Sequence, residues 1–262
     1  MMTDAFRIPI SLRPNAALIL LCMVLASCSG TKEMAEVSKE GYQSSPADGK
    51  TIADRLPDYT DTLHTLKGKG RAIVSEPNNT ERATLLFSSN RSKSLVTIRN
   101  GLGIEGGQLL TDGDTLLVYN KVDNYARRIP VRGGNLDRIN QLASLNILDI
   151  INFTLNADHV EKVQENDTHF KLFLSTGARV FVDKESHLVS EVIQPANSGL
   201  PYAKIQYDAY AQLKEFRLPR RITIFGADGQ SKIALQVGSL ELNPSLEPLT
   251  INLPEDTRIY HR

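Results

Sequence analysis

The chain has 262 residues, 41% of them hydrophobic, and its 30 basic side chains (Lys and Arg) are balanced by 30 acidic ones (Asp and Glu). This length and apolar content predict one domain of about 200 residues with a core of its own, together with a flexible arm. The neutral balance argues against a nucleic-acid partner, whose binding surface would need clustered Lys and Arg.

The N-terminal segment has the features of a targeting signal. Two arginines precede an apolar run at 16–26 that is too short for a transmembrane helix. The run ends in LASC, whose last residue is Cys28, and small residues before a cysteine resemble the processing site of bacterial lipoproteins. We therefore predict that residues 1–27 are a signal peptide and that Cys28 is the lipid anchor. The alternative is an ordinary secretory signal with a cysteine there by chance.

The residues after Cys28 bear on localisation. Ser29 is not the aspartate that commonly retains lipoproteins in the inner membrane, so by the same resemblance we expect a lipid-anchored protein of the outer membrane, with the periplasmic side favoured. Two or three acyl chains on the anchor would make the attachment stable. Residues 28–49 are polar and rich in small residues. They are predicted to be a tether reaching about 25 Å, followed by a folded domain at 50–262.

The first predicted element of the domain is a short helix. Ile52, Leu56, Tyr59 and Leu63 recur at helical spacing on one face. Because Pro57 cannot sit inside a helix without a kink, it either begins a short helix or bends this one.

A period of two, typical of β-strands, begins near Leu66. Short connections such as Asp112-Gly113 separate the runs and force neighbouring strands to be antiparallel. The predicted strands before the middle of the chain are 67–76, 82–89, 94–99, 104–110, 115–120 and 125–130. Those after the middle are 160–164, 169–175, 178–183, 188–195, 202–210, 217–225 and 232–242.

Between these two groups the period changes to that of a helix. Leu136, Ile139, Leu142 and Leu145 form one apolar stripe, with Asn135 placed to cap it. Apolar residues continue beyond the stripe, so this segment is predicted to be a buried plug. The predicted fold class is therefore mainly β with some α: a single curved antiparallel sheet with helices covering its concave face.

A glycine-rich loop between two predicted strands carries one large apolar residue. Leu102 lies between Gly101 and Gly103, so it has no sequence neighbours to pack against. It is either folded back into the core or offered to a partner outside. The spacing also matches the dinucleotide fingerprint GxGxxG, but that motif must open a helix. Because another hairpin follows instead, nucleotide binding is disfavoured.

Residues that carry enzyme or metal chemistry do not gather in the sequence. The motifs GxSxG, CxxC and HExxH are absent, and no cysteine or paired carboxylates stand near the histidines to complete a metal site. No catalytic residue, metal or cofactor is therefore expected. The five histidines are His64, His159, His169, His187 and His261.

Taken in order, these elements resemble a known family. The loop Asn100-Gly101-Leu102-Gly103, the segment LLVYNKVDNYARRIPV and the helical plug look like the outer-membrane lipoprotein receptor LolB and its soluble carrier relative LolA. Later segments, including VFVD at 180–183 and LPRRI at 218–222, look like the corresponding strands, so the resemblance covers about 52–260. Two departures are Gly101, where the receptors commonly have proline, and the absence of tryptophan.

This resemblance implies a half-open, incomplete β-barrel whose apolar interior shelters acyl chains, and a loop whose Leu102 helps to insert cargo into the membrane. The implied partners are membrane lipid, lipoprotein cargo and a periplasmic carrier protein, and we expect a monomer. A second hypothesis is a non-transporting lipoprotein that binds lipid or glycolipid in the same cavity, or serves as an accessory subunit of an envelope complex. The residues predicted to line or cap the cavity are Phe87, Val96, Val118, Leu136, Ile139, Leu142, Leu145 and Phe153.

Overall fold

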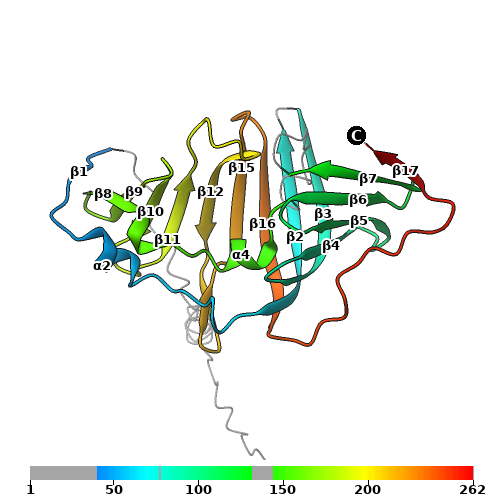
Figure 1. The fold of residues 1–262 in the computed structure, drawn as a ribbon, viewed down its shortest axis with the longest axis horizontal. Coiled ribbons are helices and arrows are strands. Elements are labelled where there is room, and N and C mark those ends of the chain that lie inside the picture. Colours follow the sequence, from blue (N-terminus) through cyan, green and yellow to red (C-terminus); the bar gives the residue numbers. More distant parts are fainter. Residues whose placement is uncertain (1–39, 77, 132–143, 262) are drawn as a thin grey trace, which may run out of the picture. The chain divides into compact units, whose positions relative to one another are not determined.

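One continuous curved sheet organises the domain (Figure 1). The computed structural model describes residues 40–76, 78–131 and 144–261. Within these residues, fifteen strands are hydrogen-bonded in the order β1-β8-β9-β10-β11-β12-β15-β16-β2-β3-β4-β5-β6-β7-β17. Because β1 and β17 lie at the two edges and do not pair with each other, the sheet is not closed.

Most strand bounds follow the predicted runs, but the run predicted at 217–225 divides into two strands, and the strands at the two edges of the sheet were not predicted. The first group is β1 (Gln43–Ser44), β2 (Thr65–Glu76), β3 (Asn79–Asn90), β4 (Ser94–Arg99), β5 (Glu105–Thr111), β6 (Thr115–Asn120) and β7 (Tyr125–Pro130). The second group is β8 (Val160–Glu165), β9 (His169–Leu174), β10 (Arg179–Asp183), β11 (Val189–Ile193), β12 (Tyr202–Asp208), β15 (Arg221–Gly226), β16 (Lys232–Leu242) and β17 (Arg258–His261). A separate two-stranded hairpin consists of β13 (Ala211–Leu213) and β14 (Phe216–Leu218).

Two antiparallel meanders meet in the middle of the sheet. The first runs from β2 to β7, and the second runs from β8 to β16; the long pairing of β16 with β2 joins them. The predicted antiparallel sheet is therefore confirmed, with one exception among the described strands. The strand β17 runs parallel to β7, because the chain enters it beside Asn124, where the Arg258 N–H donates to the Asn124 carbonyl oxygen at 3.2 Å.

Helices are short in the part of the chain that the structure describes. The helical elements are α2 (Gly49–Ala53), α4 (Ile147–Ile151) and the 3-10 helix η1 (Ala157–His159). Asp48 caps α2 by accepting from the N–H groups of Lys50 and Thr51, and the helix ends before Pro57. The longer or Pro57-initiated helix predicted from apolar spacing is therefore wrong: the apolar residues after Ala53 reach the core from irregular backbone, which suits the restricted residues around a proline.

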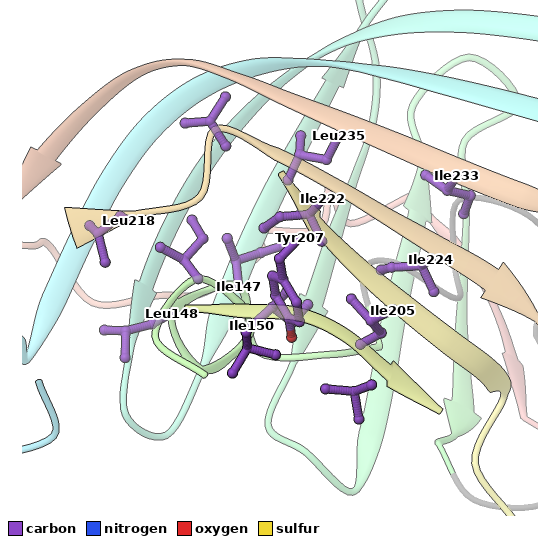
Figure 2. Packing of buried hydrophobic residues seen from close by; sticks show 14 of the residues in the cluster. Ile147, Leu148, Ile150, Ile205, Tyr207, Leu218, Ile222, Ile224, Ile233 and Leu235 are labelled. Atoms are coloured by element: carbon purple, nitrogen blue, oxygen red, sulfur yellow. The ribbon is translucent and has the colours of Figure 1, made fainter. Parts of the chain in front are cut away.

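The predicted plug is represented by α4, in which Ile147, Leu148, Ile150 and Ile151 are buried. The Asn146 side chain caps this helix by accepting from the Leu148 N–H at 2.9 Å. Figure 2 shows side chains of α4 gathered with those of strands β12, β15 and β16 in one apolar cluster. The earlier part of the plug, with Leu136, Ile139 and Leu142, lies outside the described residues. The half-barrel with a helical cover therefore stays a prediction.

The core occupies one face of the sheet. Along β2, for example, Leu66, Ala72 and Val74 are buried, whereas Lys67 and Lys69 on the opposite face are exposed. This alternation is the pattern that predicted the strands. No helix among the described residues combines the length and the apolar character that crossing a bilayer requires.

Candidate functional site

An open apolar cleft lies on the core-facing side of the sheet, near one end of β9, β10 and β11. Its volume is about 380 Å³. Its apolar lining residues are Phe153, Leu155, Leu174, Ala178, Val180, Val192, Pro195 and Leu200. The polar residues of its lining are Thr154, Asn156, His159, Thr176, Gln194 and Ser198.

The sheet forms the floor of this cleft. Val180 of β10 stands opposite Val192 of β11, so the two side chains share the inner face. Beside the floor, the Phe153 ring packs against the Tyr207 ring with centroids 5.9 Å apart. At the end of the strands Gly177 adopts a φ of +82°, a conformation that glycine allows at no steric cost, and its turn lies close to Pro195.

The lining of the cleft carries almost no charge. His159 is the one ionisable side chain among the lining residues, and it is exposed on η1. Its carbonyl oxygen accepts from the Ser175 N–H at 2.9 Å, which ties η1 to the β9–β10 turn. A charged group buried among the apolar lining residues would lose hydration, and the lining holds no Asp, Glu, Lys or Arg to pair with it. The geometry therefore suits an uncharged chain with any polar end at the rim.

The N-terminal part of the described chain packs beside the cleft. The strand β1 pairs with β8, and Lys50 of α2 forms an ion pair with Asp158 of η1 at 3.0 Å. Gly49 allows the close approach, because a Cβ there would lie 2.4 Å from the Val160 Cγ1 atom. Residues 40–48 of the predicted tether thus include a short pairing with the sheet; the remainder of that segment, and Cys28 with it, lies outside the described residues.

Five of the eight predicted cavity residues are described by the structure. Phe153 lines the cleft. Phe87 and Val96 are buried members of the hydrophobic core, and Val118 and Leu145 pack against that core as partly buried residues. The predicted cavity at these four residues stays a prediction, whereas the cleft described above lies in the other half of the sheet.

The β4–β5 loop presents Leu102 to solvent with 86% of its surface exposed. The Asn100 side chain organises the loop by accepting from the N–H groups of Leu102 and Ile104, both at 3.0 Å. Gly103 has a φ of +81°, and the loop leads directly into β5. Of the two positions open to Leu102 on sequence grounds, the structure shows the exposed one.

The histidines remain separate in the structure. Within the described residues, His, Cys, Asp and Glu side chains form no group of three that could hold a metal ion. His169 is buried, its Nδ1 atom lies 2.9 Å from the Thr168 hydroxyl, and desolvation by burial lowers its pKa below the ordinary value. These contacts indicate that His169 is a structural histidine.

Comparison with known proteins shows which solved structures share this fold. No protein-family model matches the sequence, and no curated protein matches it. Among solved structures, a Vibrio parahaemolyticus domain assigned to outer membrane lipoprotein sorting has a TM-score of 0.56 at 12% identity, covering 76% of this chain and 94% of that one. A LolA superfamily protein from Nitrosomonas europaea has a TM-score of 0.52 at 12% identity, covering 76% and 96%. The chain has the LolA-like fold. A DUF1329 family protein from Desulfovibrio piger also has a similar structure. Its TM-score is 0.53 at 14% identity, covering 76% of this chain and 93% of that one.

The LolA-like fold confirms the family resemblance seen in the sequence at the level of architecture. Identities of 12–14% show shared structure and leave activity to the site itself. Sequence reasoning did not identify most of the cleft residues. Val180 and Val192 alternate in the same way as Phe87 and Val96, so periodicity gave no signal that could tell which inner-face residues line the cleft.

Proposed function

We propose that this protein is an outer-membrane-anchored lipoprotein that binds acyl chains and helps to receive lipoproteins or to insert them into the outer membrane. The observation that carries the proposal is the nearly uncharged apolar cleft on the inner face of a LolA-like sheet. Two structural neighbours are described as a lipoprotein-sorting domain and a LolA superfamily protein, which supports the same substrate class.

The size and chemistry of the cleft fit this role. A volume of about 380 Å³ falls within the range of about 300–1,000 Å³ that ligand pockets occupy. Burying ten methylenes would contribute about 8 kcal/mol before ordering costs are subtracted. Because apolar contact is non-directional, an acyl chain could pass from this cleft to the bilayer interior with little change in free energy.

Two further residues would bring the bound cargo to the outer membrane. Acylated Cys28 would hold the domain at the outer membrane, facing the periplasm, and the exposed Leu102 would enter the bilayer where cargo is released. The partners on this account are a periplasmic carrier protein that delivers cargo, the lipoprotein cargo and membrane lipid.

Mass spectrometry of the lipid that co-purifies with the protein tests the proposal. The full chain carrying Cys28→Ser is compared with the same chain carrying Leu155→Glu, which places a charge in the cleft, and Leu213→Glu, a half-buried leucine outside the cleft as the matched control. We expect acyl-bearing molecules on the parent chain and on the Leu213→Glu control, with loss from Leu155→Glu. A parent chain free of acyl-bearing molecules would contradict the proposal.

Transfer of an acylated lipoprotein to vesicles separates a receptor from a simple binding module. The Cys28→Ser chain is loaded with the lipoprotein and mixed with phosphatidylethanolamine vesicles, and the cargo that floats with the vesicles is measured. A receptor should release cargo to the vesicles, and Leu102→Asp should slow that release without reducing loading. Loading without release would favour the non-transporting alternative.

A further inference from the structure

The three most exposed large apolar residues of the described chain lie in two loops at one end of the sheet. Leu102 is 86% exposed and Ile104 60% in the β4–β5 loop, and Val122 is 77% exposed in the β6–β7 turn. In an antiparallel meander every second connection falls at the same end. The sheet therefore places these two connections side by side, separated only by β5 and β6.

Direct contacts join the two loops. The Lys121 N–H donates to the Gly106 carbonyl oxygen at 3.0 Å, and the Lys121 ammonium lies 3.6 Å from the Glu105 carboxylate. Val122 follows Lys121 in the chain, and Ile104 precedes Glu105. These contacts tie the β6–β7 turn to the start of β5, next to the residues that carry the exposed apolar side chains.

Each loop is held in shape by an asparagine at the end of the preceding strand. Asn100 accepts from two N–H groups of its loop, as described above, and Asn120 accepts from the Asp123 N–H at 2.9 Å. The C-terminal segment adds a further tie, because the Arg258 guanidinium donates to the Asp123 carbonyl oxygen at 2.6 Å. A braced turn loses little conformational entropy when its apolar side chain meets a partner.

Other connections of the sheet lack this character. At the opposite end, β5 and β6 are joined by Asp112-Gly113-Asp114, and at the same end β15 and β16 are joined by 227–230, which reads ADGQ. Neither carries a large apolar side chain. The apolar tip is therefore a local feature of two loops and not a general property of the turns.

We propose that Val122 and Ile104 act with Leu102 as a two-loop tip that inserts into the lipid bilayer. The choice of lipid as the partner rests on the proposed function, in which Cys28 keeps the domain at the membrane. Large apolar side chains exposed together at the surface mark interaction sites, membranes among them. Since Lys121 is paired with Glu105, the charge beside the tip is balanced, and the interaction should depend on apolar contact with little effect of salt.

The absence of tryptophan in the chain provides a direct test. In the full chain carrying Cys28→Ser, Leu102→Trp and Val122→Trp each introduce a single reporter at the tip. Ala227→Trp places one in the β15–β16 turn at the same end of the sheet and is the matched control. Phosphatidylethanolamine vesicles should shift the emission of both tip reporters to the blue, and brominated lipid should quench them. The control should change little.

A response of Leu102→Trp alone would overturn the two-loop tip and leave the proposed function standing; no response from either tip reporter would also overturn it. A second variant, Val122→Asp, should lower vesicle partition by about tenfold, whereas Ala227→Asp should not. Unchanged partition of Val122→Asp would contradict the proposal. The lipid that co-purifies with Val122→Asp should match that of the parent chain, so failure of the tip and failure of acyl binding give different results.

Discussion

Mutating two leucines of the β4–β5 hairpin tests whether its loop contacts the membrane or supports the fold. Leu102 is 86% exposed in the β4–β5 loop, whereas Leu109 in β5 is 2% exposed and stands between Val96 and Val118 on the neighbouring strands. Leu102→Asp should change the free energy of unfolding by less than about 0.5 kcal/mol, because the new carboxylate stays in water. Leu109→Asp should lower it by at least about 3 kcal/mol, from lost apolar burial and a buried charge.

Urea denaturation of the Cys28→Ser chain, followed by circular dichroism, measures both effects. For a domain of this size each kcal/mol also corresponds to about 2–4 °C in melting temperature, so Leu109→Asp should melt at least about 6 °C lower. Leu102→Asp should melt with the parent chain and yet lose about 1.5–3 kcal/mol of membrane contact. A loss of several kcal/mol of stability in Leu102→Asp would show that the loop is structural and would refute its role at the membrane.

The remaining predictions concern packing, pH and the anchor. Gly68→Ala should destabilise the domain by about 1–3 kcal/mol, because the added Cβ would lie 2.6 Å from the Phe87 ring. Gly101→Ala is the control, because its Cβ would meet nothing within 4 Å, and it should leave urea denaturation unchanged. Burial lowers the pKa of His169 in the folded state, so the unfolded chain binds its proton at higher pH. Stability should be full above about pH 6.5 and fall as the pH drops from there toward the folded pKa. Urea denaturation at pH 7.5 and 5.5 should show a smaller difference for His169→Asn; an equal difference would contradict the assignment. Cys28→Ser should move the protein into the soluble periplasmic fraction, and continued dependence on detergent for its release would rule out the lipid anchor.

Much of the sheet was predictable because local rules determine it. Alternation along β2 to β7, interrupted by turns such as Asp112-Gly113, locates the strands and requires antiparallel neighbours. The parallel strand β17 was missed, since four residues give too short a pattern and its position depends on the return of the chain to Asn124. The helix after Ile52 was overpredicted because apolar spacing records which residues face the core, even where the backbone is irregular.

The site was less predictable than the fold. The glycine neighbours of Leu102 left two positions open, of which the structure shows the exposed one, and the place of Val122 beside it follows from the pairing of the consecutive strands β4 to β7. The position of the cleft depends on tertiary packing. Val180 and Val96 are both buried core residues with the same local pattern, and only the three-dimensional structure shows that Val180 also lines the cleft.

Photocrosslinking of a bound acyl chain tests the central claim most directly. A fatty acid with a photoactivatable group near its methyl end is bound to the Cys28→Ser chain, irradiated, and mapped by peptide mass spectrometry. Binding in the cleft predicts crosslinks within 153–159, 174–180 and 192–200, with loss of the crosslinks in Leu155→Glu. Crosslinks confined to the strands around Phe87 and Val118, or none at all, would contradict it.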